Sequence, residues 1–250
     1  MTALRAEVRK LLTTQVWFWT ALLALGLTLL VTCLTSALVD PDDGGRPLEA
    51  VLNAATSFGY VVAAVLGVIG ITGEYRHLTA TPTFLSIPRR VTVIGAKLAL
   101  HLLAGLVLGV LCIGVATAVA APWMSARGIE VDLGAESTVR IIAGGIITVA
   151  IFGIIGVGVG ALLRNQVAAV VGIIVYLFLI EGILSAIPKV QEAYPYLPGG
   201  AASALISTDD PNVQSPTELL DPWQGGVLLL AYGLGFALLG SLLTVRRDVT

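Results

Sequence analysis

The sequence predicts an all-α polytopic membrane protein with six transmembrane helices, organised as a single transmembrane domain over residues 1–250. Of its 250 residues, 56% are hydrophobic and only 12% are charged, and the mean hydropathy of +0.93 lies outside the range of soluble domains. Six apolar runs each approach the ~20 residues that a helix needs to cross about 30 Å of hydrocarbon. The runs are continuously apolar and do not alternate with polar residues, which favours helices over the strands of a membrane barrel.

The six expected spans can be placed with little freedom along the chain. They cover residues 17–38, 52–72, 98–121, 139–163, 167–187 and 225–245. The first run is too long for a cleaved signal peptide, and no convincing small-residue cleavage site follows it. We therefore expect it to remain in the protein as an anchor.

The positions of lysine and arginine predict the orientation, because basic residues that flank a span are retained in the cytoplasm. With the amino terminus inside, ten of the 14 basic residues are cytoplasmic: Arg5, Arg9, Lys10, Arg76, Arg89, Arg90, Lys97, Arg164, Arg246 and Arg247. The outer loops keep Arg46, Arg127, Arg140 and Lys189. We expect a multi-pass protein of the plasma membrane with both termini in the cytoplasm.

Residues 1–15 precede the first span and show an amphipathic pattern. Apolar side chains recur there at helical spacing, at Leu4, Val8, Leu11 and Leu12. The basic residues of this stretch lie largely off that stripe, as in helices that rest on a membrane surface. The sequence predicts a short interfacial helix, and the alternative is a plain flank of the first span.

The segment between the second and third spans, residues 73–97, holds the only sizeable polar block on the expected cytoplasmic side. Residues 74–90 read EYRHLTATPTFLSIPRR. This block could be an ordinary solvated loop. The functional interpretation is a short helix on the inner membrane face, which Pro82 and Pro88 would bracket and whose side chains would dock into a partner.

The chain carries no motif for catalysis or for ATP binding. It has neither a G-x-S-x-G nor an H-E-x-x-H sequence, and Lys10, Lys97 and Lys189 do not follow a glycine, as a phosphate-binding loop requires. His77 and His101 have no companion ligands at metal-binding spacing. We expect no enzyme activity, no cofactor and no metal in this chain, and any ATP must be hydrolysed elsewhere.

The polar block also carries a resemblance to a known family. The pattern E-Y-R-H-x-T-x-x-x-T-F-L-x-x-P-R-R at residues 74–90, followed by A-K-L at residues 96–98, resembles the type-2 ABC export permeases. The resemblance implies that residues 73–97 form a coupling segment against a separate ATP-binding subunit, which would bind ATP and Mg. Two such subunits and two permease copies would form the transporter in the lipid bilayer, without a nucleic-acid partner.

The resemblance also implies which residues couple to the partner. The candidates are Glu74, Tyr75, Arg76, Thr79, Thr83, Phe84, Pro88, Arg89 and Arg90. Glu74, Arg76 and Thr79 match the family's motif, with an acidic residue, an arginine and a threonine after the second span. For Glu74 and Arg76 the alternative is helix capping and interfacial anchoring, which need no partner.

Glu181 is the only acidic residue inside an expected span, where an ionisable group is costly enough to indicate a role. It would be a proton carrier in a self-sufficient ion-coupled transporter or channel, which is the competing function. Alternatively, it lies within about two turns of the outer interface and simply reaches the headgroups or the outer vestibule. The otherwise apolar spans suit a hydrophobic or amphipathic cargo.

Two further patterns concern packing. The glycine pairs Gly105–Gly109 and Gly156–Gly160 have the spacing that lets membrane helices approach closely. The outer segment, residues 188–223, contains six prolines and is expected to form rigid turns or short re-entrant helices. Related exporters have short helices there.

Overall fold

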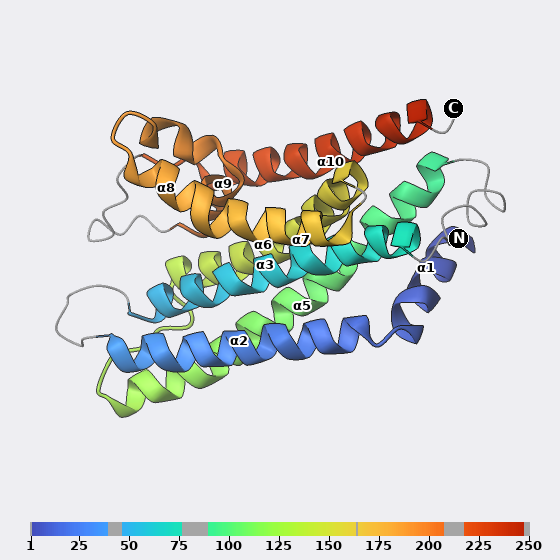
Figure 1. Cartoon of the computed structure of the whole chain (residues 1–250). Helices are drawn as coiled ribbons and strands as arrows, with labels where there is room; N and C mark the ends of the chain where they lie inside the picture. Colours follow the sequence, from blue (N-terminus) through green and yellow to red (C-terminus); the bar gives the residue numbers. More distant parts are fainter. Residues whose placement is uncertain (1, 40–46, 77–89, 164, 208–217, 248–250) are drawn as a thin grey trace.

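The computed structural model describes residues 2–39, 47–76, 90–163, 165–207 and 218–247, and the regular elements of these residues are all helices. Six of the helical segments are long and apolar enough to cross a membrane, which confirms the predicted fold class and makes this a multi-pass membrane protein by helix composition. In chain order the elements are α1 (Thr2–Thr13), α2 (Val16–Leu38), α3 (Pro47–Arg76), α5 (Arg90–Ala126), α6 (Glu136–Leu163), α7 (Gln166–Val175), the π-helix η1 (Tyr176–Ile180), α8 (Glu181–Ala186), the 3₁₀-helix η2 (Gln191–Tyr196), α9 (Pro198–Ile206) and α10 (Pro222–Arg247) (Figure 1).

Local sequence explains several helix boundaries. Pro47 and Pro198 open α3 and α9, where their missing N–H groups cost no intrahelical hydrogen bond. Asn165 caps α7, because its Oδ1 accepts the Ala168 N–H at 3.1 Å. The six apolar runs fall on α2, α3, α5, α6, the succession α7–η1–α8, and α10.

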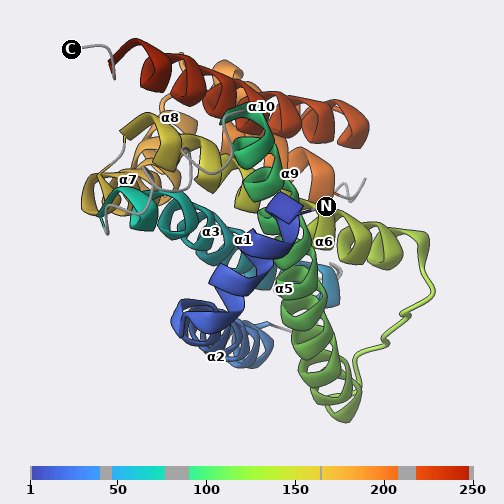
Figure 2. The same ribbon diagram turned by 90° about the vertical axis from the view of Figure 1, so that its right-hand side faces the viewer.

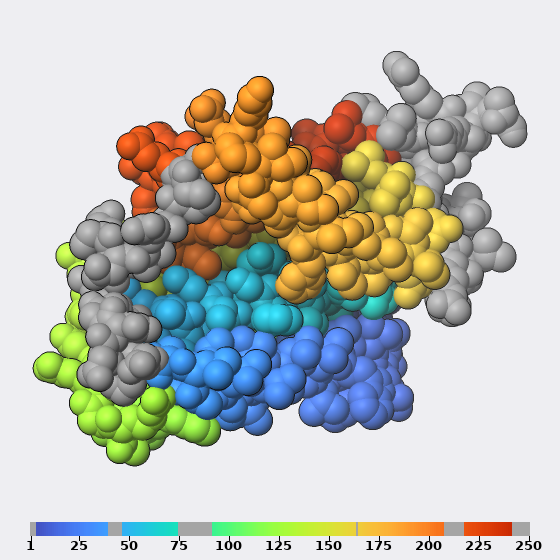
Figure 3. Space-filling model, turned by 60° about the vertical axis from the view of Figure 1, so that its left-hand side comes forward, coloured from blue at the N-terminus to red at the C-terminus, as the bar shows by residue number. Residues whose placement is uncertain are grey.

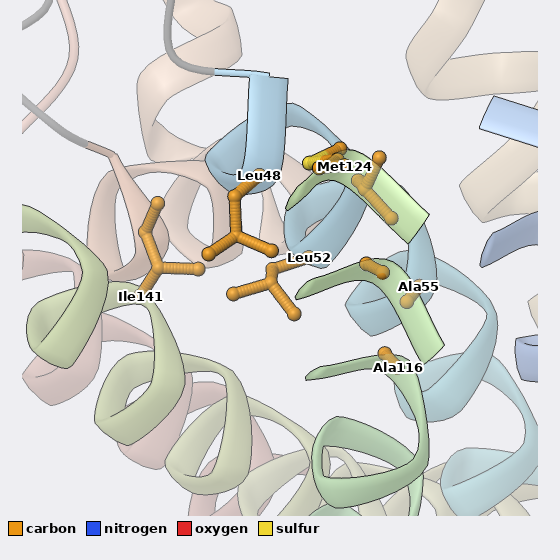
Figure 4. Close-up of a cluster of buried hydrophobic side chains, with 8 residues drawn as sticks. Leu48, Leu52, Ala55, Ala116, Met124 and Ile141 are labelled. Atoms are coloured by element: carbon orange, nitrogen blue, oxygen red, sulfur yellow. The ribbon is translucent and has the colours of Figure 1, made fainter. Parts of the chain in front are cut away.

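Two spanning helices extend beyond their apolar runs. The apolar run of residues 52–72 lies within the longer α3, and α5 continues past Pro122 to Ala126. The added turns are buried in one cluster, in which Leu48 of α3 and Met124 of α5 pack together with Leu52 (Figure 4). Burial of these apolar side chains explains why the helices do not stop where the hydropathy falls.

Helices α3 and α6 form the centre of the bundle. In their apolar windows 61% and 72% of the residues are buried, against 17% for the fifth span and 28% for α2 and α10. Helices α2 and α5 pack on one side of this pair, and α7 and α10 lie on the other (Figure 1). The peripheral helices expose mainly leucine and valine, as expected for surfaces that face lipid.

The central helices approach each other closely at glycines. A Cβ atom added at Gly156 would meet the Ala64 backbone carbonyl, so only glycine fits between α6 and α3 at this point. At Gly105 an added Cβ would lie 2.9 Å from the Ala150 Cα. Both glycine spacings seen in the sequence therefore mark helix contacts.

The two ends of the bundle differ. Helix α1 lies at one end together with the end of α3, the start of α5 and the end of α10, at the right of Figure 1 and facing the viewer in Figure 2. At the opposite end, η2 and α9 occupy part of the segment expected on the outer side. Helix α9 is almost wholly buried and packs against α6 and α10, with the Leu205 carbonyl against Gly144 and the Ala201 carbonyl against Gly225.

Candidate functional site: a buried ion-pair cluster joining α1, α3 and α5

The structure places part of the expected coupling segment. Glu74 lies near the end of α3, Tyr75 and Arg76 complete that helix, and Arg90 begins α5. The remaining candidates lie outside the described residues, as does the helix expected between Pro82 and Pro88: Thr79, Thr83, Phe84, Pro88 and Arg89.

Glu74 belongs to a cluster of four charged side chains, which we call the inner cluster: Glu7, Lys10, Glu74 and Lys97. Both lysines reach the same oxygen, because Glu74 Oε1 lies 2.7 Å from Lys10 Nζ and 2.9 Å from Lys97 Nζ. Glu7 contacts each lysine with a different oxygen: Oε1 lies 2.9 Å from Lys10 Nζ, and Oε2 lies 2.6 Å from Lys97 Nζ. The four residues thereby connect α1, α3 and α5.

Lys97 is the centre of the inner cluster. It is only 2% exposed, and its ammonium donates to Glu7 Oε2 and to the Gly70 carbonyl at 3.3 Å while also pairing with Glu74. An ammonium has three donors, and these three contacts account for them. A buried lysine is costly unless it is paired and hydrogen-bonded, so the two glutamates are needed to keep this cation charged.

The pKa values of the α1 residues follow from the cluster. Burial raises the pKa of Glu7, but the Lys97 charge and the hydrogen bonds from both lysines outweigh it and hold the pKa below its ordinary value. For Lys10, burial lowers the pKa, and hydrogen bonds to Glu7 and Glu74 more than offset that effect and raise it. Both groups are therefore charged at neutral pH in the folded protein.

His101 lies one turn beyond Lys97 and extends the polar contacts into the bundle. Its Nδ1 is 2.8 Å from the Lys97 carbonyl, which can only accept, so Nδ1 carries the proton. Nε2 is buried without a hydrogen-bond partner among the described residues. It lies against Gly70, where an added Cβ would overlap the ring. Gly70 thus lets α3 and α5 come together beside the inner cluster.

Sequence reasoning identified one of the four cluster residues. The sequence indicates a coupling role for Glu74. Lys97 counts there only among the basic residues that indicate the cytoplasmic side and as part of the A-K-L pattern. Lys10 was assigned to the polar face of the amino-terminal helix, and Glu7 was not singled out. The usable signal was an acidic residue on an otherwise apolar and basic helix, which needs a cation nearby when it is buried.

The amino-terminal helix differs from the expectation in one respect. The sequence placed its apolar stripe at Leu4, Val8, Leu11 and Leu12. In the structure the most buried of the described side chains in α1 is Glu7, which is 5% exposed, whereas Leu12 is 60% exposed. Because Glu7 is paired with Lys97, the charged residue turns inward, and the apolar positions flank it.

Glu181 lies far along the chain from the inner cluster. It is only 3% exposed, so the protein itself encloses its side chain. It follows directly on η1, the π-turn of the fifth span, which rotates the helix locally. Its Oε2 accepts the Gly199 N–H at 2.7 Å, and its Oε1 has no hydrogen-bond partner among the described residues.

Comparisons with other proteins do not assign a family. No protein-family model matches the chain, and no curated protein matches it. The function is therefore inferred from the motif at residues 74–90 and from the geometry of the two buried polar sites.

Proposed function

We propose that this chain is the transmembrane permease subunit of an ABC exporter and forms the translocation pathway for a hydrophobic or amphipathic cargo. ATP hydrolysis takes place on a separate subunit, in keeping with the lack of a phosphate-binding loop in this chain. Two permease copies and two ATP-binding subunits make up the transporter in the plasma membrane. The bundle of six long apolar helices supports a role within the membrane.

The observation that carries this proposal is the position of Glu74. It is the first residue of the family-like motif, and it lies in the inner cluster with Lys97 and Glu7. Helices α3 and α5 lead into and out of the segment of residues 77–89, so the cluster ties together both flanks of that segment. Helix α1 is tied to the same point.

This arrangement provides a route for force. A subunit that moves the segment of residues 77–89 pulls on the end of α3 and on the start of α5. The inner cluster makes the ends of α3 and α5 move together, because separating Lys97 from its carboxylates would leave buried charges unpaired. Helix α3 in turn packs along α6 through close glycine contacts, so the motion reaches the centre of the bundle.

The proposal is tested by co-purification. The chain is expressed with the ATP-binding subunit encoded beside it, extracted in detergent and analysed by size-exclusion chromatography. We expect the two proteins to co-elute, and Arg76→Glu to abolish co-elution because it reverses a charge in the docking motif. Lys189→Glu, an exposed charge reversal in the segment expected outside, is the matched control and should co-elute. Absence of any association for the wild type would refute the assignment.

A second candidate function is favoured by Glu181. A buried carboxyl with one unpartnered oxygen is a feature of proton-coupled carriers. A self-sufficient carrier would move protons in liposomes that contain this chain alone, and Glu181→Gln would stop that flux. The export proposal expects no such proton flux.

A further inference from the structure

Helix α9 is inserted into the bundle with little apolar area to hold it there. Seven of its nine residues are buried, and most of these are glycine or alanine. Its main chain meets glycines of both neighbouring helices, Gly144 of α6 and Gly225 of α10. Such small residues bury far less apolar surface than leucine or phenylalanine would. Polar contacts therefore carry a larger share of the anchoring of α9 than in the long helices.

The amino-terminal end of α9 has no local cap. The first amides of a helix lack a partner within the helix, and the first hydrogen bond within α9 is donated by the Ala201 N–H to the Leu197 carbonyl. Leu197, the N-cap residue, makes no side-chain hydrogen bond, and Pro198 has no N–H. Gly199 is thus the first residue of α9 with a buried amide that needs an acceptor from elsewhere.

Glu181 of the fifth span supplies that acceptor. Its Oε2 accepts the Gly199 N–H at 2.7 Å inside the protein. A Cβ atom added at Gly199 would overlap Oε2, so the carboxyl reaches the amide only because residue 199 is glycine. Helix α9 packs mainly on α6, α10 and η2. The hydrogen bond therefore adds a direct link from α9 to the fifth span.

The π-turn η1 determines where Glu181 points. The fifth span lies on the outside of the molecule over α3, as the yellow and orange surface in Figure 3 shows. Its residues on both sides of Glu181 are exposed, with Ile180 at 41% and Ile183 at 51%. Because η1 ends directly before Glu181, its wider turn sets the rotation of the helix at this residue. A shift of one residue in that rotation would move the carboxyl toward the exposed surface and away from α9.

We propose that α9 is a part of the bundle that can open separately, and that Glu181 is the tertiary cap that keeps it docked. Loss of the hydrogen bond to Gly199 releases the amino-terminal turn of α9. This positioning role needs an acceptor oxygen and no change in the charge of the carboxyl. It differs in this respect from the proton carrier, in which Glu181→Gln stops the flux. The cap does not depend on the identity of a partner subunit or of a cargo.

Hydrogen–deuterium exchange of the purified chain in lipid nanodiscs tests the cap. We expect Glu181→Leu to speed exchange of the α9 amides about tenfold, because the buried Gly199 N–H loses its acceptor and local opening becomes easier. Glu181→Gln keeps an acceptor oxygen and should exchange within about threefold of the wild type. Glu192→Leu, at an exposed carboxyl in the neighbouring η2, is the matched control and should exchange like the wild type.

A second variant covers the case in which Glu181→Leu does not fold. Gly199→Ala places a methyl group where Oε2 lies and so separates the same pair from the other side. We expect the same rise in α9 exchange, although alanine is the better helix former. Gly182→Ala, at an exposed glycine beside Glu181 where an added Cβ meets nothing within 4 Å, is its control and should leave α9 exchange unchanged.

Three results would overturn the cap. Wild-type exchange of α9 in a folded Glu181→Leu or Gly199→Ala protein would mean that the hydrogen bond does not hold the helix. Exchange in Glu181→Gln as fast as in Glu181→Leu would mean that the acceptor oxygen is not what matters. An equal rise in the peptides of α6 would mean that the whole bundle is destabilised and that α9 does not open separately.

Discussion

At the residue scale, Lys97 is the buried cation that holds the inner cluster together. Its ammonium is enclosed by Glu7, Glu74 and the Gly70 carbonyl, and its side chain is only 3% exposed. Lys10 pairs with the same two glutamates, but its side chain is 42% exposed. The two lysines therefore make similar ion pairs in very different surroundings, which allows burial to be tested separately from charge.

We expect Lys97→Met to lower the free energy of unfolding by about 3 kcal/mol, because it removes the buried cation and leaves Glu7 Oε2 without its partner. Lys10 remains as the only lysine beside the two carboxylates. Lys10→Met should cost no more than about 1 kcal/mol, since water screens an exposed pair. Denaturation of both variants in detergent, followed by circular dichroism, measures the difference. Equal losses would mean that the burial of Lys97 contributes nothing beyond its charge.

The lowered pKa of Glu7 predicts a dependence of stability on pH. The folded state favours the charged carboxylate, so this stabilisation is complete above the ordinary carboxyl pKa and is lost as the pH falls through the lowered folded-state pKa. Wild type should therefore melt higher than Glu7→Gln at neutral pH, and the gap should close on acidification. Melting curves across the acidic range test this, and a gap independent of pH would contradict it.

Only some features of the two buried polar sites could be predicted from the sequence. The charge of Glu74 and its place after a span could be read from the sequence. Its pairing with Lys97 and Glu7 could not, because it depends on how α1 folds back against α5, which periodicity does not specify. The contact of Glu181 with Gly199 could not be predicted for a similar reason, since it joins residues 18 positions apart, with η2 between them.

At the scale of elements, glycines determine how closely the central helices pack. Without a hydrophobic driving force between helices in lipid, close van der Waals contact contributes much of their association. Gly156 lies against the Ala64 carbonyl, and Gly67 lies against the Gly153 carbonyl. Helices α3 and α6 therefore depend on these positions for their contact.

We expect Gly156→Ala to destabilise the protein by about 2 kcal/mol, because the new methyl group must push α6 away from α3. Gly114→Ala is the matched control: it lies in the spanning helix α5, and an added Cβ there meets nothing within 4 Å. That change should stabilise the protein by about 0.5 kcal/mol, because alanine favours helix. If both variants melted alike, close packing at Gly156 would not matter.

The elements themselves were largely predictable. Hydropathy located all six spans, because a helix in lipid must be long and continuously apolar. It did not reveal the π-turn η1, because a π-turn changes the backbone hydrogen bonds of the fifth span and not its hydropathy. It did not show that α5 continues past the apolar run, where Met124 packs against α3.

At the scale of the whole molecule, the two buried polar sites lie in different parts of the bundle. The inner cluster lies at the end that carries α1 and the two helices leading to residues 77–89. Glu181 and α9 belong to the opposite part of the chain, within and after the fifth span. In the proposed exporter, force from ATP hydrolysis enters at the first site.

The central claim is that this chain works with an ATP-binding subunit. The most direct measurement is the rate of ATP hydrolysis by the subunit encoded beside it, in nanodiscs with and without this chain. We expect the chain to change the rate, Arg76→Glu to remove the change, and Lys189→Glu to keep it. A rate that is identical with and without the chain would contradict the proposed function.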